Sequence, residues 1–527
     1  MGRAASLPRL AGVALFSASA WNSGWAADSA ALPSIPDLQQ SMARGELSSE
    51  LLVRRSLAAA DSQDFLNAFI SLDRRGALNR ARWLDESRRR GEILGPLHGI
   101  PVAVKDNIHV AGMPNTAGTP LLESVVPRED APAVGRLKAA GAIVLGKTNM
   151  HELAFGITSA NAAYGAVGNA RDPRFMAGGS SGGTAVAIAS GMAVAGLGTD
   201  TGGSSRIPAA LNGIVGFRPT GGRYPAAGLT RISSTRDTIG PMARTVGDVA
   251  LLDGIIAGKD GMLSDVDLRG LRIGIPRRYF YDNLETRVHD SIEDLLRILG
   301  EAGVDLVRTD LVGIGPLTEK TGLPIVLYEA RSLLGDYLAV HLPGRSLKAL
   351  VLAAASPDVR ELLGRVERRE VSDAEYRRAM ERYRPRLKRL YADYFGEHEV
   401  EAILFPTTPL TARPIEGSAP VVDLNGAPVP AFATYIRNTD PGSTANLPGL
   451  SIPLAVPREG LPVGVEIDGP EGSDRRLLAI GAAIERLLQQ RAGVVDAHIG
   501  SIGAMPQPDR ITVTGREPES FDNLVRE

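Results

Sequence analysis

Three short stretches of this 527-residue chain contain residue types that could carry out acyl transfer. The first, HGIPVAVKDNI, has Lys105 at the end of an apolar run. The second, AGGSSGGTAVAIASG, encloses Ser180 and Ser181 between glycine pairs, and the third, GLGTDTGGSSRIPAA, places Ser204 after two glycines. A lysine and several serines beside glycine-rich turns predict nucleophilic catalysis by the protein's own side chains.

A serine hydroxyl becomes a nucleophile when a neighbouring base takes its proton, and a lysine can be that base if burial keeps it neutral. Lys105, at the end of an apolar strand, is the candidate base. Gly202 and Gly203 lack side chains, so their N–H groups could approach a developing oxyanion. Each stretch alone is also explained by a buried, ion-paired lysine or by ordinary glycine turns. The three together predict a Ser-Lys acyl-transfer site.

The segment GAIVLGKT (residues 141–148) matches the phosphate-binding loop pattern, but its local order is wrong for a nucleotide site. A phosphate loop follows a strand and opens a helix. Here the four variable residues are themselves apolar, and DAPAVGRLKAA before them predicts a helix with Asp130 as N-cap and Gly141 just past its end. We therefore expect helix, glycine and strand, which excludes phosphate binding.

The glycine-rich stretch at Ser180 also satisfies G-x-S-x-G, the nucleophile turn of Ser-His-Asp hydrolases. That turn requires a preceding strand, whereas RDPRFMA predicts a loop. A catalytic histidine would be needed as well, and sequence position alone does not exclude His289, His341, His398 or His498.

Composition narrows the function classes further. The formal net charge is −2, so there is no basic excess to attract nucleic acid. The chain has 0 cysteines, which excludes a cysteine nucleophile and disulfides, and its 7 histidines form no zinc-binding pattern. We expect no metal and no cofactor.

The first residues have the pattern of a secretory signal peptide. Arg3 and Arg9 precede an apolar run over residues 10–21, and small residues lead up to Ala26. The run is too short to span a bilayer, so no stable membrane insertion is expected. The sequence predicts a signal peptide over residues 1–26 and export to the periplasm or the medium.

The rest of the chain has the organisation of an α/β protein. Helical spacing over about residues 35–90 predicts two or three amphipathic helices, and short apolar runs between glycines over 96–258 predict alternating strands and helices. Residues of about 315–394 are helical and charged, with a solvated basic run at their end. Residues 403–409 and 449–456 have strand character, and the tail after Ala497 has no apolar periodicity.

Taken together, these motifs resemble the amidase signature family. GGSSGG is followed 24 positions later (204 − 180) by the serine of DTGGSSRIP, with the lysine of KDN upstream. The resemblance extends through LNAFISLD, GPLHGIPVAVKDNI, GAIVLGKTNMHELAFG, DTIGPMARTVGD, FPTTP, NLPGLSIPLAV and LPVGVEIDGP, and covers nearly the whole chain after the leader.

The resemblance implies a role for each matching residue. Ser204 would be the acylated nucleophile, Ser180 a bridging serine held by a cis peptide bond, and Lys105 the base acting through Ser180. The other implied roles are an oxyanion loop (Thr201, Gly202, Gly203), a brace for that loop (Asp200, Arg206) and supporting hydroxyls (Ser181, Ser205).

The resemblance also implies one α/β domain, over residues 27–495, with a mixed sheet covered by helices on both faces. Residues of about 311–400 would form the variable segment that shapes the acyl pocket, and 496–527 a loosely ordered tail. Ala177 departs from the proline that family members usually have there, and FRPTGGRYP with STRDTIGPM is similar to the arylacetamide-type members that act on indoleacetamide or mandelamide.

We therefore expect hydrolysis of a small-molecule carboxylic amide to a carboxylate and ammonia or an amine. The alternatives are a peptide, aryl-acylamide or carbamate hydrolase of the same mechanism, and the glutamine-hydrolysing subunit of a tRNA amidotransferase. A homodimer is compatible with the sequence, which contains no signal for the oligomeric state.

Overall fold

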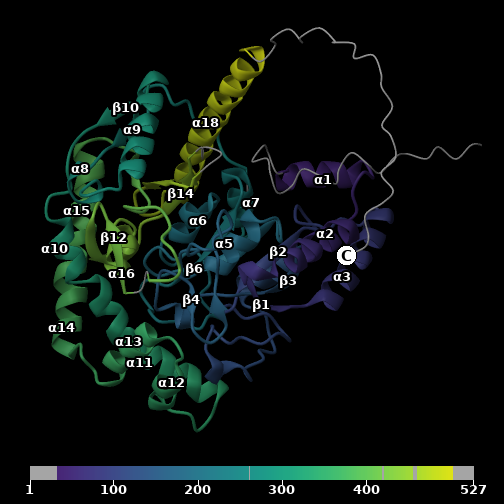
Figure 1. The fold of residues 1–527 in the computed structure, drawn as a ribbon, viewed down its shortest axis with the longest axis horizontal. Coiled ribbons are helices and arrows are strands. Elements are labelled where there is room, and N and C mark those ends of the chain that lie inside the picture. The colour runs from purple at the N-terminus through teal and green to yellow at the C-terminus, as the bar shows by residue number, and fades with distance from the viewer. Residues whose placement is uncertain (1–32, 260–261, 418–419, 455–459, 503–527) are drawn as a thin grey trace, which may run out of the picture. The chain divides into compact units, whose positions relative to one another are not determined.

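Within the described residues, eleven strands of this computed structural model form one mixed sheet (Figure 1). The structure describes residues 33–502 except 260–261, 418–419 and 455–459. Across the sheet the strands are β1 (Phe69–Leu72), β3 (Ile143–Thr148), β2 (Pro101–Lys105), β6 (Ala195–Asp200), β8 (Thr238–Ala243), β7 (Val215–Arg218), β14 (Gly449–Pro453), β15 (Gly464–Asp468), β11 (Ala402–Pro406), β9 (Arg272–Gly274) and β10 (Asp305–Val307).

The central strands are short apolar runs because both of their faces are covered. Every residue of β2, β6 and β8 is buried. β2 pairs in parallel with β3 and β6, whereas β6 pairs antiparallel with β8. β2 and β6 therefore end at the same edge of the sheet, where Lys105 and Asp200 are their last residues. Helices flank the sheet, and the prediction of an α/β fold with a mixed sheet is confirmed.

The helices predicted for residues 35–90 are confirmed, with strand β1 between the second and the third. Ser34 and Asp37 form a capping box at the first helix, and the side chain of Ser48 caps the second. The three helices are α1 (Ile35–Ala43), α2 (Ser49–Ser62) and α3 (Arg74–Arg89).

The segment that mimics a phosphate loop has the predicted order of helix, glycine and strand. α4 (Pro132–Ala139) is followed by Gly141 at φ +98° and then by β3. The predicted N-cap is wrong, because Ala131 occupies that position. The Asp130 carboxylate instead accepts from Ala111 N and pairs with Lys138.

Small buried helices lie against the centre of the sheet. All residues of α6 (Arg206–Asn212) are buried, as are most of those of α5 (Gly182–Ala189). The other elements between β2 and β10 along the chain are η2 (Pro120–Leu122), η3 (Glu152–Ala154), β4 (Ala160–Asn161), β5 (Gly165–Ala166), α7 (Val246–Ala257), α8 (Arg277–Phe280) and α9 (Thr286–Glu301).

The predicted helical segment of about 315–394 is confirmed and packs around an apolar cluster of its own. Leu153 and Phe155, from η3 and the residue after it, join Val326 and Leu334 in this cluster. The helices are α10 (Ile314–Glu319), α11 (Gly322–His341), α12 (Leu347–Ala353), α13 (Pro357–Glu367), α14 (Asp373–Arg378), the π-helical turn η4 (Ala379–Tyr383) and α15 (Arg384–Glu397).

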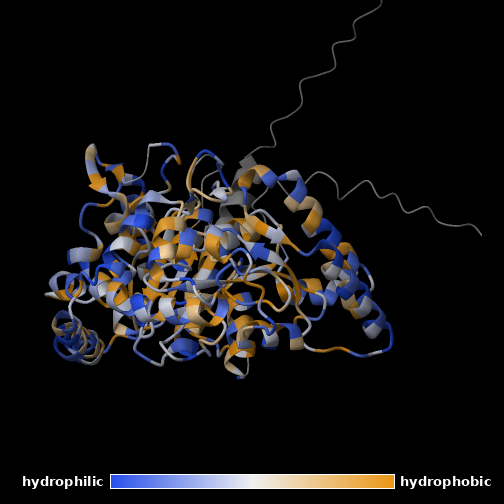
Figure 2. Ribbon diagram, turned by 90° about the horizontal axis from the view of Figure 1, so that it is seen from below, coloured by the Kyte–Doolittle hydropathy of each residue, from blue (hydrophilic) through white to orange (hydrophobic). Residues whose placement is uncertain are grey.

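The C-terminal part returns to the sheet, as predicted from the strand character of residues 403–409 and 449–456. Between β11 and β14 lie β12 (Val421–Leu424), β13 (Ala427–Pro430), α16 (Ala431–Ile436) and α17 (Asp440–Ala445), and α18 (Asp474–Ile502) follows β15. Figure 2 shows hydrophobic residues concentrated among the inner elements and hydrophilic residues on the outer helices.

The chain divides into a unit that ends at Glu485 and a second unit that begins at Arg486. Because α18 continues to Ile502, residues 496–502 of the predicted loose tail are helical. The predicted signal peptide lies outside the described residues. None of the helices in the described part of the chain has the length and apolar character to cross a membrane.

Candidate active site

Lys105 and Ser180 meet in the buried centre of the molecule. Lys105 is the last residue of β2, and its Nζ lies 2.7 Å from Ser180 Oγ, just before α5, and 2.7 Å from Thr199 Oγ1 on β6. Asn107 Nδ2 donates to the same Thr199 hydroxyl at 3.1 Å. Because β2 and β6 pair in parallel, their carboxyl ends bring the amine and the threonine together.

The surroundings of Lys105 favour its neutral form. Its side chain is fully buried, and burial lowers its pKa to about 7. The nearby carboxylates of Asp200 and Asp237 oppose this shift but do not cancel it. A substantial fraction of Lys105 is therefore unprotonated near neutral pH and can accept a proton from Ser180.

Ser180 is held at the start of a buried turn. The Gly179–Ser180 peptide bond is cis, as the family resemblance implied. Ser180 O accepts from His151 N at 3.1 Å. The neighbouring Ser181 hydroxyl donates to Thr199 O at 3.2 Å, and Ser181 N donates to Ser204 O at 3.1 Å. Ser181 thus connects both serine-containing loops to the end of β6.

Ser204 lies in the turn between β6 and α6. Each backbone carbonyl of residues 200–204 accepts a hydrogen bond from another part of the protein. Ser204 is 7% exposed. In chain order the five carbonyls accept from Arg218 Nη1 (2.6 Å), Arg236 Nε (3.2 Å), Thr439 Oγ1 (2.6 Å), Arg206 N with Ile207 N (2.9 and 2.8 Å) and Ser181 N (3.1 Å). Fixed carbonyls also fix the peptide N–H groups, because each peptide unit is planar.

The N–H groups of this turn fall into two sets. Gly203 N donates to Asp200 Oδ1 at 2.9 Å and Ser205 N to Asp200 Oδ2 at 3.1 Å. Within the described residues, the N–H groups of Thr201, Gly202 and Ser204 have no hydrogen-bond acceptor. Of the three residues predicted to donate to the oxyanion, Gly203 therefore already donates its N–H to the Asp200 carboxylate. Ser204 N, which no sequence motif singled out as a donor, has no acceptor in the described part of the chain.

The two glycines of the turn are required by packing as well. A Cβ on Gly202 would lie 2.8 Å from Ile436 Cδ1, and one on Gly203 would collide with Thr439. Gly203 also has φ +132°, a conformation that favours glycine. The end of α16 and the loop that follows it therefore lie so close to the turn that they leave no room for side chains at these two positions.

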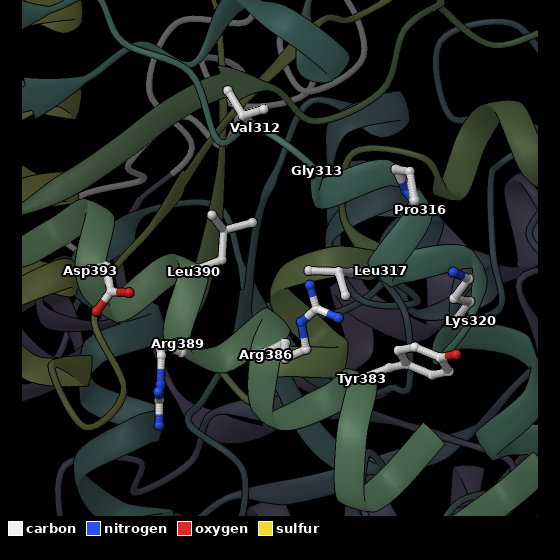
Figure 3. A pocket seen from close by; sticks show the side chains of 10 residues that line it. All are labelled: Val312, Gly313, Pro316, Leu317, Lys320, Tyr383, Arg386, Arg389, Leu390 and Asp393. Atoms are coloured by element: carbon white, nitrogen blue, oxygen red, sulfur yellow. The ribbon is translucent and has the colours of Figure 1, made fainter. Parts of the chain in front are cut away.

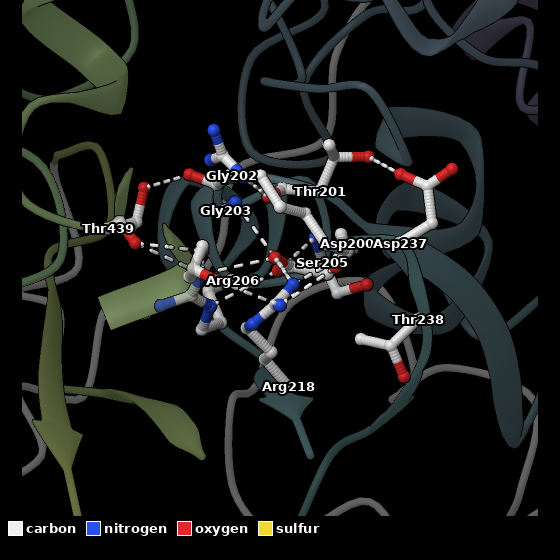
Figure 4. Close-up of polar contacts among 12 residues, drawn as sticks. Asp200, Thr201, Gly202, Gly203, Ser205, Arg206, Arg218, Asp237, Thr238 and Thr439 are labelled. Carbon is white, nitrogen blue, oxygen red and sulfur yellow. Dashed lines mark hydrogen bonds and ion pairs between the residues drawn. The ribbon is translucent and has the colours of Figure 1, made fainter. Parts of the chain in front are cut away.

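Asp200 and Arg206 form a buried charged cluster beneath the turn (Figure 4). Arg206 Nε and Nη2 each lie 3.1 Å from the Asp200 carboxylate, and Arg218 Nη1 lies 3.0 Å from it. Burial raises the pKa of Asp200, but the two guanidinium groups outweigh burial and hold it well below its usual range. Arg206 Nη1 also donates to Glu466 and lies 4.0 Å from Asp468 Oδ1.

Three further residues belong to this site although the sequence motifs did not single them out. Thr199 contacts Lys105 directly, Asp237 accepts from Thr201 Oγ1 at 2.6 Å, and Arg236 donates to Thr201 O. Thr199 lies on β6, whereas the other two lie in STRDTIGPM, just before β8. Their proximity depends on the pairing of β6 with β8, which residue spacing does not show.

The lysine of the phosphate-loop mimic has a structural role beside the site. Lys147 Nζ lies 3.1 Å from Asp106 Oδ1, and both side chains are buried. Burial lowers the pKa of Lys147, and the Asp106 carboxylate opposes that shift. Lys147 also donates to Asn115 Oδ1 at 3.1 Å. This ion pair fixes the residue that follows Lys105.

The Ser-His-Asp alternative finds no support in the described side chains. Residues 171–177, before the glycine-rich turn, form no strand, as predicted. His289 contacts Asp290 on the surface, His341 packs against Tyr337, and His398 packs against Tyr394. The side chain of His498 lies outside the described residues. No described histidine side chain makes a hydrogen bond to Ser180 or Ser204.

A groove lies away from this site, between α10 and α15. Its volume is about 520 Å³, and it is lined by residues such as Leu317, Tyr383 and Arg386 (Figure 3). It shares no residue with the Lys105 site. Among the described residues, no group of three or more histidines and carboxylates could hold a metal ion.

Comparisons of the sequence with known proteins point to one family. The pattern of the Amidase family matches residues 51–478. The chain is 42% identical to an indoleacetamide hydrolase of Agrobacterium vitis over 462 residues, which cover 88% of this chain and 98% of the relative. It is 44% identical to a mandelamide hydrolase of Pseudomonas putida over 459 residues, covering 84% and 89%.

The fold comparison gives the same result. The crystal structure of an amidase superposes with a TM-score of 0.77 at 35% sequence identity, covering 86% of this chain and 100% of that one. The chain therefore belongs to the amidase family. It is an amidase, a hydrolase that acts on carbon–nitrogen bonds.

Proposed function

We propose that this amidase hydrolyses a primary arylacetamide through an acyl-enzyme on Ser204, with Lys105 as the base acting through Ser180. The observation that carries the proposal is the 2.7 Å contact between Lys105 Nζ and Ser180 Oγ in a fully buried setting. Burial lowers the pKa of the lysine to about 7, so it can act as a base at neutral pH.

Acylation begins when neutral Lys105 takes the proton of Ser180 and Ser180 takes the proton of Ser204. Ser204 Oγ then attacks the amide carbon, and a tetrahedral intermediate forms with a negatively charged oxygen. As the carbon–nitrogen bond breaks, the proton returns through Ser180 to the leaving nitrogen, and ammonia departs. The product of this stage is an ester of Ser204 with the arylacetyl group.

The N–H groups of Thr201, Gly202 and Ser204, which have no acceptor among the described residues, are the candidate donors to the oxyanion. The carbonyls of their peptide units are already anchored, so the donors need little reorganisation during the reaction. In the second stage Lys105 and Ser180 draw a proton from a water molecule, which attacks the ester. As the ester bond breaks, the proton passes back from Lys105 through Ser180 to Ser204, and the carboxylic acid leaves and gives its own proton to solvent.

The arylacetamide assignment rests on relatives and on apolar surroundings. Two relatives that match most of this chain are named for indoleacetamide and mandelamide, which both carry an aromatic ring near a primary amide. Ile436 lies against Gly202 in the turn of Ser204. An apolar side chain at this position suits an aromatic acyl group better than a charged one.

The test is product release by the purified protein from indoleacetamide, mandelamide, an anilide, a peptide amide and a carbamate, with Ser204→Ala as the control. We expect ammonia from the two primary arylacetamides and none from the control. Turnover of only the anilide, peptide amide or carbamate would overturn the substrate assignment and favour the alternative hydrolases of the same mechanism.

The glutamine-hydrolysing subunit of a tRNA amidotransferase is the rival from another class. Such a subunit needs protein partners, so it would co-purify with them and release ammonia from glutamine. Purification of the chain alone, with turnover of arylacetamides and not of glutamine, would exclude it.

Export is a separate part of the proposal. It rests on Arg3, Arg9 and the apolar run over residues 10–21. Cell fractionation with mass measurement of the N-terminus tests it: cleavage after Ala26 and recovery outside the cytoplasm are expected. An uncleaved N-terminus in the cytoplasm would contradict export and leave the catalytic proposal intact.

A further inference from the structure

The peptide unit between Thr201 and Gly202 is oriented by one buried arginine. Arg236 Nε donates to Thr201 O at 3.2 Å. This peptide bond is trans, and in a trans unit the C=O and the N–H point in opposite directions. By holding the carbonyl of Thr201, Arg236 therefore directs the N–H of Gly202 to the other side of the turn.

The same guanidinium reaches two other elements. Arg236 Nη1 donates to Gly322 O, in the first residue of α11, at 2.7 Å, and Nη2 pairs with Asp440 at the start of α17. Arg236 is 3% exposed. A Cβ on Gly322 would collide with Asp440, so the glycine allows α11 to approach this ion pair. One side chain thus connects the turn of Ser204 to α11 and α17.

We propose that Arg236 is a positioning residue that aims the Gly202 N–H at the oxyanion and ties α11 to the catalytic turn. This inference rests on the proposed function. Arginine suits the role because its planar group donates in several fixed directions at once. A lysine at this position could keep a charge beside Asp440 but could not reach all three partners.

A merely structural arginine would affect stability, whereas a positioning residue affects transition-state binding. The test compares the wild type with Arg236→Gln, using phenylacetamide as substrate. Phenylacetaldehyde serves as a probe because addition of the Ser204 hydroxyl to its carbonyl gives a tetrahedral adduct with an oxygen in the oxyanion position. Phenylacetate serves as a probe of ground-state binding.

We expect Arg236→Gln to lower kcat by about 10- to 100-fold. Complete removal of an oxyanion donor lowers kcat by as much or more, because the substitution at Arg236 only misplaces the donor. The inhibition constant of phenylacetaldehyde should rise by a similar factor. KM and the inhibition constant of phenylacetate should each change by less than about threefold. If kcat and aldehyde affinity stay at the wild-type values, or if aldehyde and phenylacetate weaken equally, the inference is overturned.

Arg331→Gln is the matched control. Arg331 lies on α11 and also holds backbone carbonyls, with Nη1 2.6 Å from Glu367 O, but it does not contact the turn. We expect normal kcat and normal aldehyde affinity in this variant. An equal loss in both variants would show a general effect of disturbing α11 and would contradict the specific role of Arg236.

Two further variants keep the outcomes separate. If Arg236→Gln does not fold, Arg236→Lys takes its place in the test. We expect this variant also to bind phenylacetaldehyde more weakly than the wild type while its affinity for phenylacetate stays nearly unchanged. Ser204→Ala must lose both turnover and aldehyde binding. If it retains turnover, the proposed function fails and this inference fails with it; if only the Arg236 variants behave as wild type, the inference alone fails.

Discussion

Lys105 Nζ lies 2.7 Å from Ser180 Oγ, and both side chains are completely buried. Because no described carboxylate forms an ion pair with this amine, burial is the main influence on its protonation. The proposed reaction therefore depends on whether Lys105 is protonated, because only the neutral amine can accept the proton of Ser180.

The first prediction concerns pH. Lys105 acts as a base only when neutral, and burial lowers its pKa to about 7. We therefore expect kcat/KM to rise about tenfold per pH unit well below this pKa and to level off above it. A stopped assay with phenylacetamide across the pH range on both sides of neutrality measures this. A profile that is flat across neutrality, or that falls as pH rises, would contradict the role of Lys105.

The second prediction separates two adjacent serines. Ser204→Ala should lower kcat by at least about 10⁴-fold, because the nucleophile is lost. Ser205→Ala should keep most of the activity, since the Ser205 hydroxyl is buried without a hydrogen-bond partner among the described residues. Ammonia release by the two purified variants is the measurement. Equal losses would argue against Ser204 as the acylated residue.

The third prediction concerns Thr199, whose hydroxyl accepts from both Lys105 and Asn107. Thr199→Val keeps the shape but leaves two buried donors without this acceptor, at a cost of about 1–3 kcal/mol of stability for an unsatisfied group. We expect kcat to fall by about tenfold because Lys105 is less firmly placed. Thr199→Ser keeps the hydroxyl and should stay near the wild type. Similar kinetics for the valine and serine variants would show that this hydrogen bond does not matter.

The fourth prediction concerns the charged cluster under the turn. Burial raises the pKa of Glu466 well above its usual range and the neighbouring Asp468 adds to the effect, while the Arg206 guanidinium opposes it, so the anionic form of Glu466 is disfavoured in the folded protein. Glu466→Gln should therefore change the free energy of unfolding little. Asp200→Asn should cost about 3–5 kcal/mol, because it removes the anion that Arg206 and Arg218 share.

Chemical denaturation of both cluster variants gives the comparison. A large loss in Glu466→Gln would mean that Glu466 is ionised in the folded protein. A small loss in Asp200→Asn would mean that the remaining carboxylates neutralise the two arginines without it.

The sequence allowed prediction of the fold class and of the approach of Ser180 to Lys105, but not of Thr199, which also contacts the lysine. Apolar runs such as IPVAV predict buried strands, and the apolar variable residues of GAIVLGKT predict the strand found there. The N-cap of α4 could not be predicted from local sequence. The Asp130 carboxylate binds Lys138 and accepts from Ala111 N instead, and these contacts exist only in the folded protein.

The backbone donors of the turn were predicted only in part. Local sequence indicates that Gly202 and Gly203 permit close approach, but it does not show that Asp200 folds back to take Gly203 N. Arg236 and Thr439 anchor this turn from distant parts of the chain. Such contacts depend on tertiary structure, which residue spacing alone does not determine.

The most direct test of the central claim is labelling with an arylmethanesulfonyl fluoride, followed by peptide mass spectrometry. We expect inactivation with one label per chain on Ser204, and much slower labelling of Lys105→Ala, since the base would be missing. Inactivation with the label on another residue, or equally fast labelling of Lys105→Ala, would contradict the proposal that Lys105 activates Ser204 through Ser180.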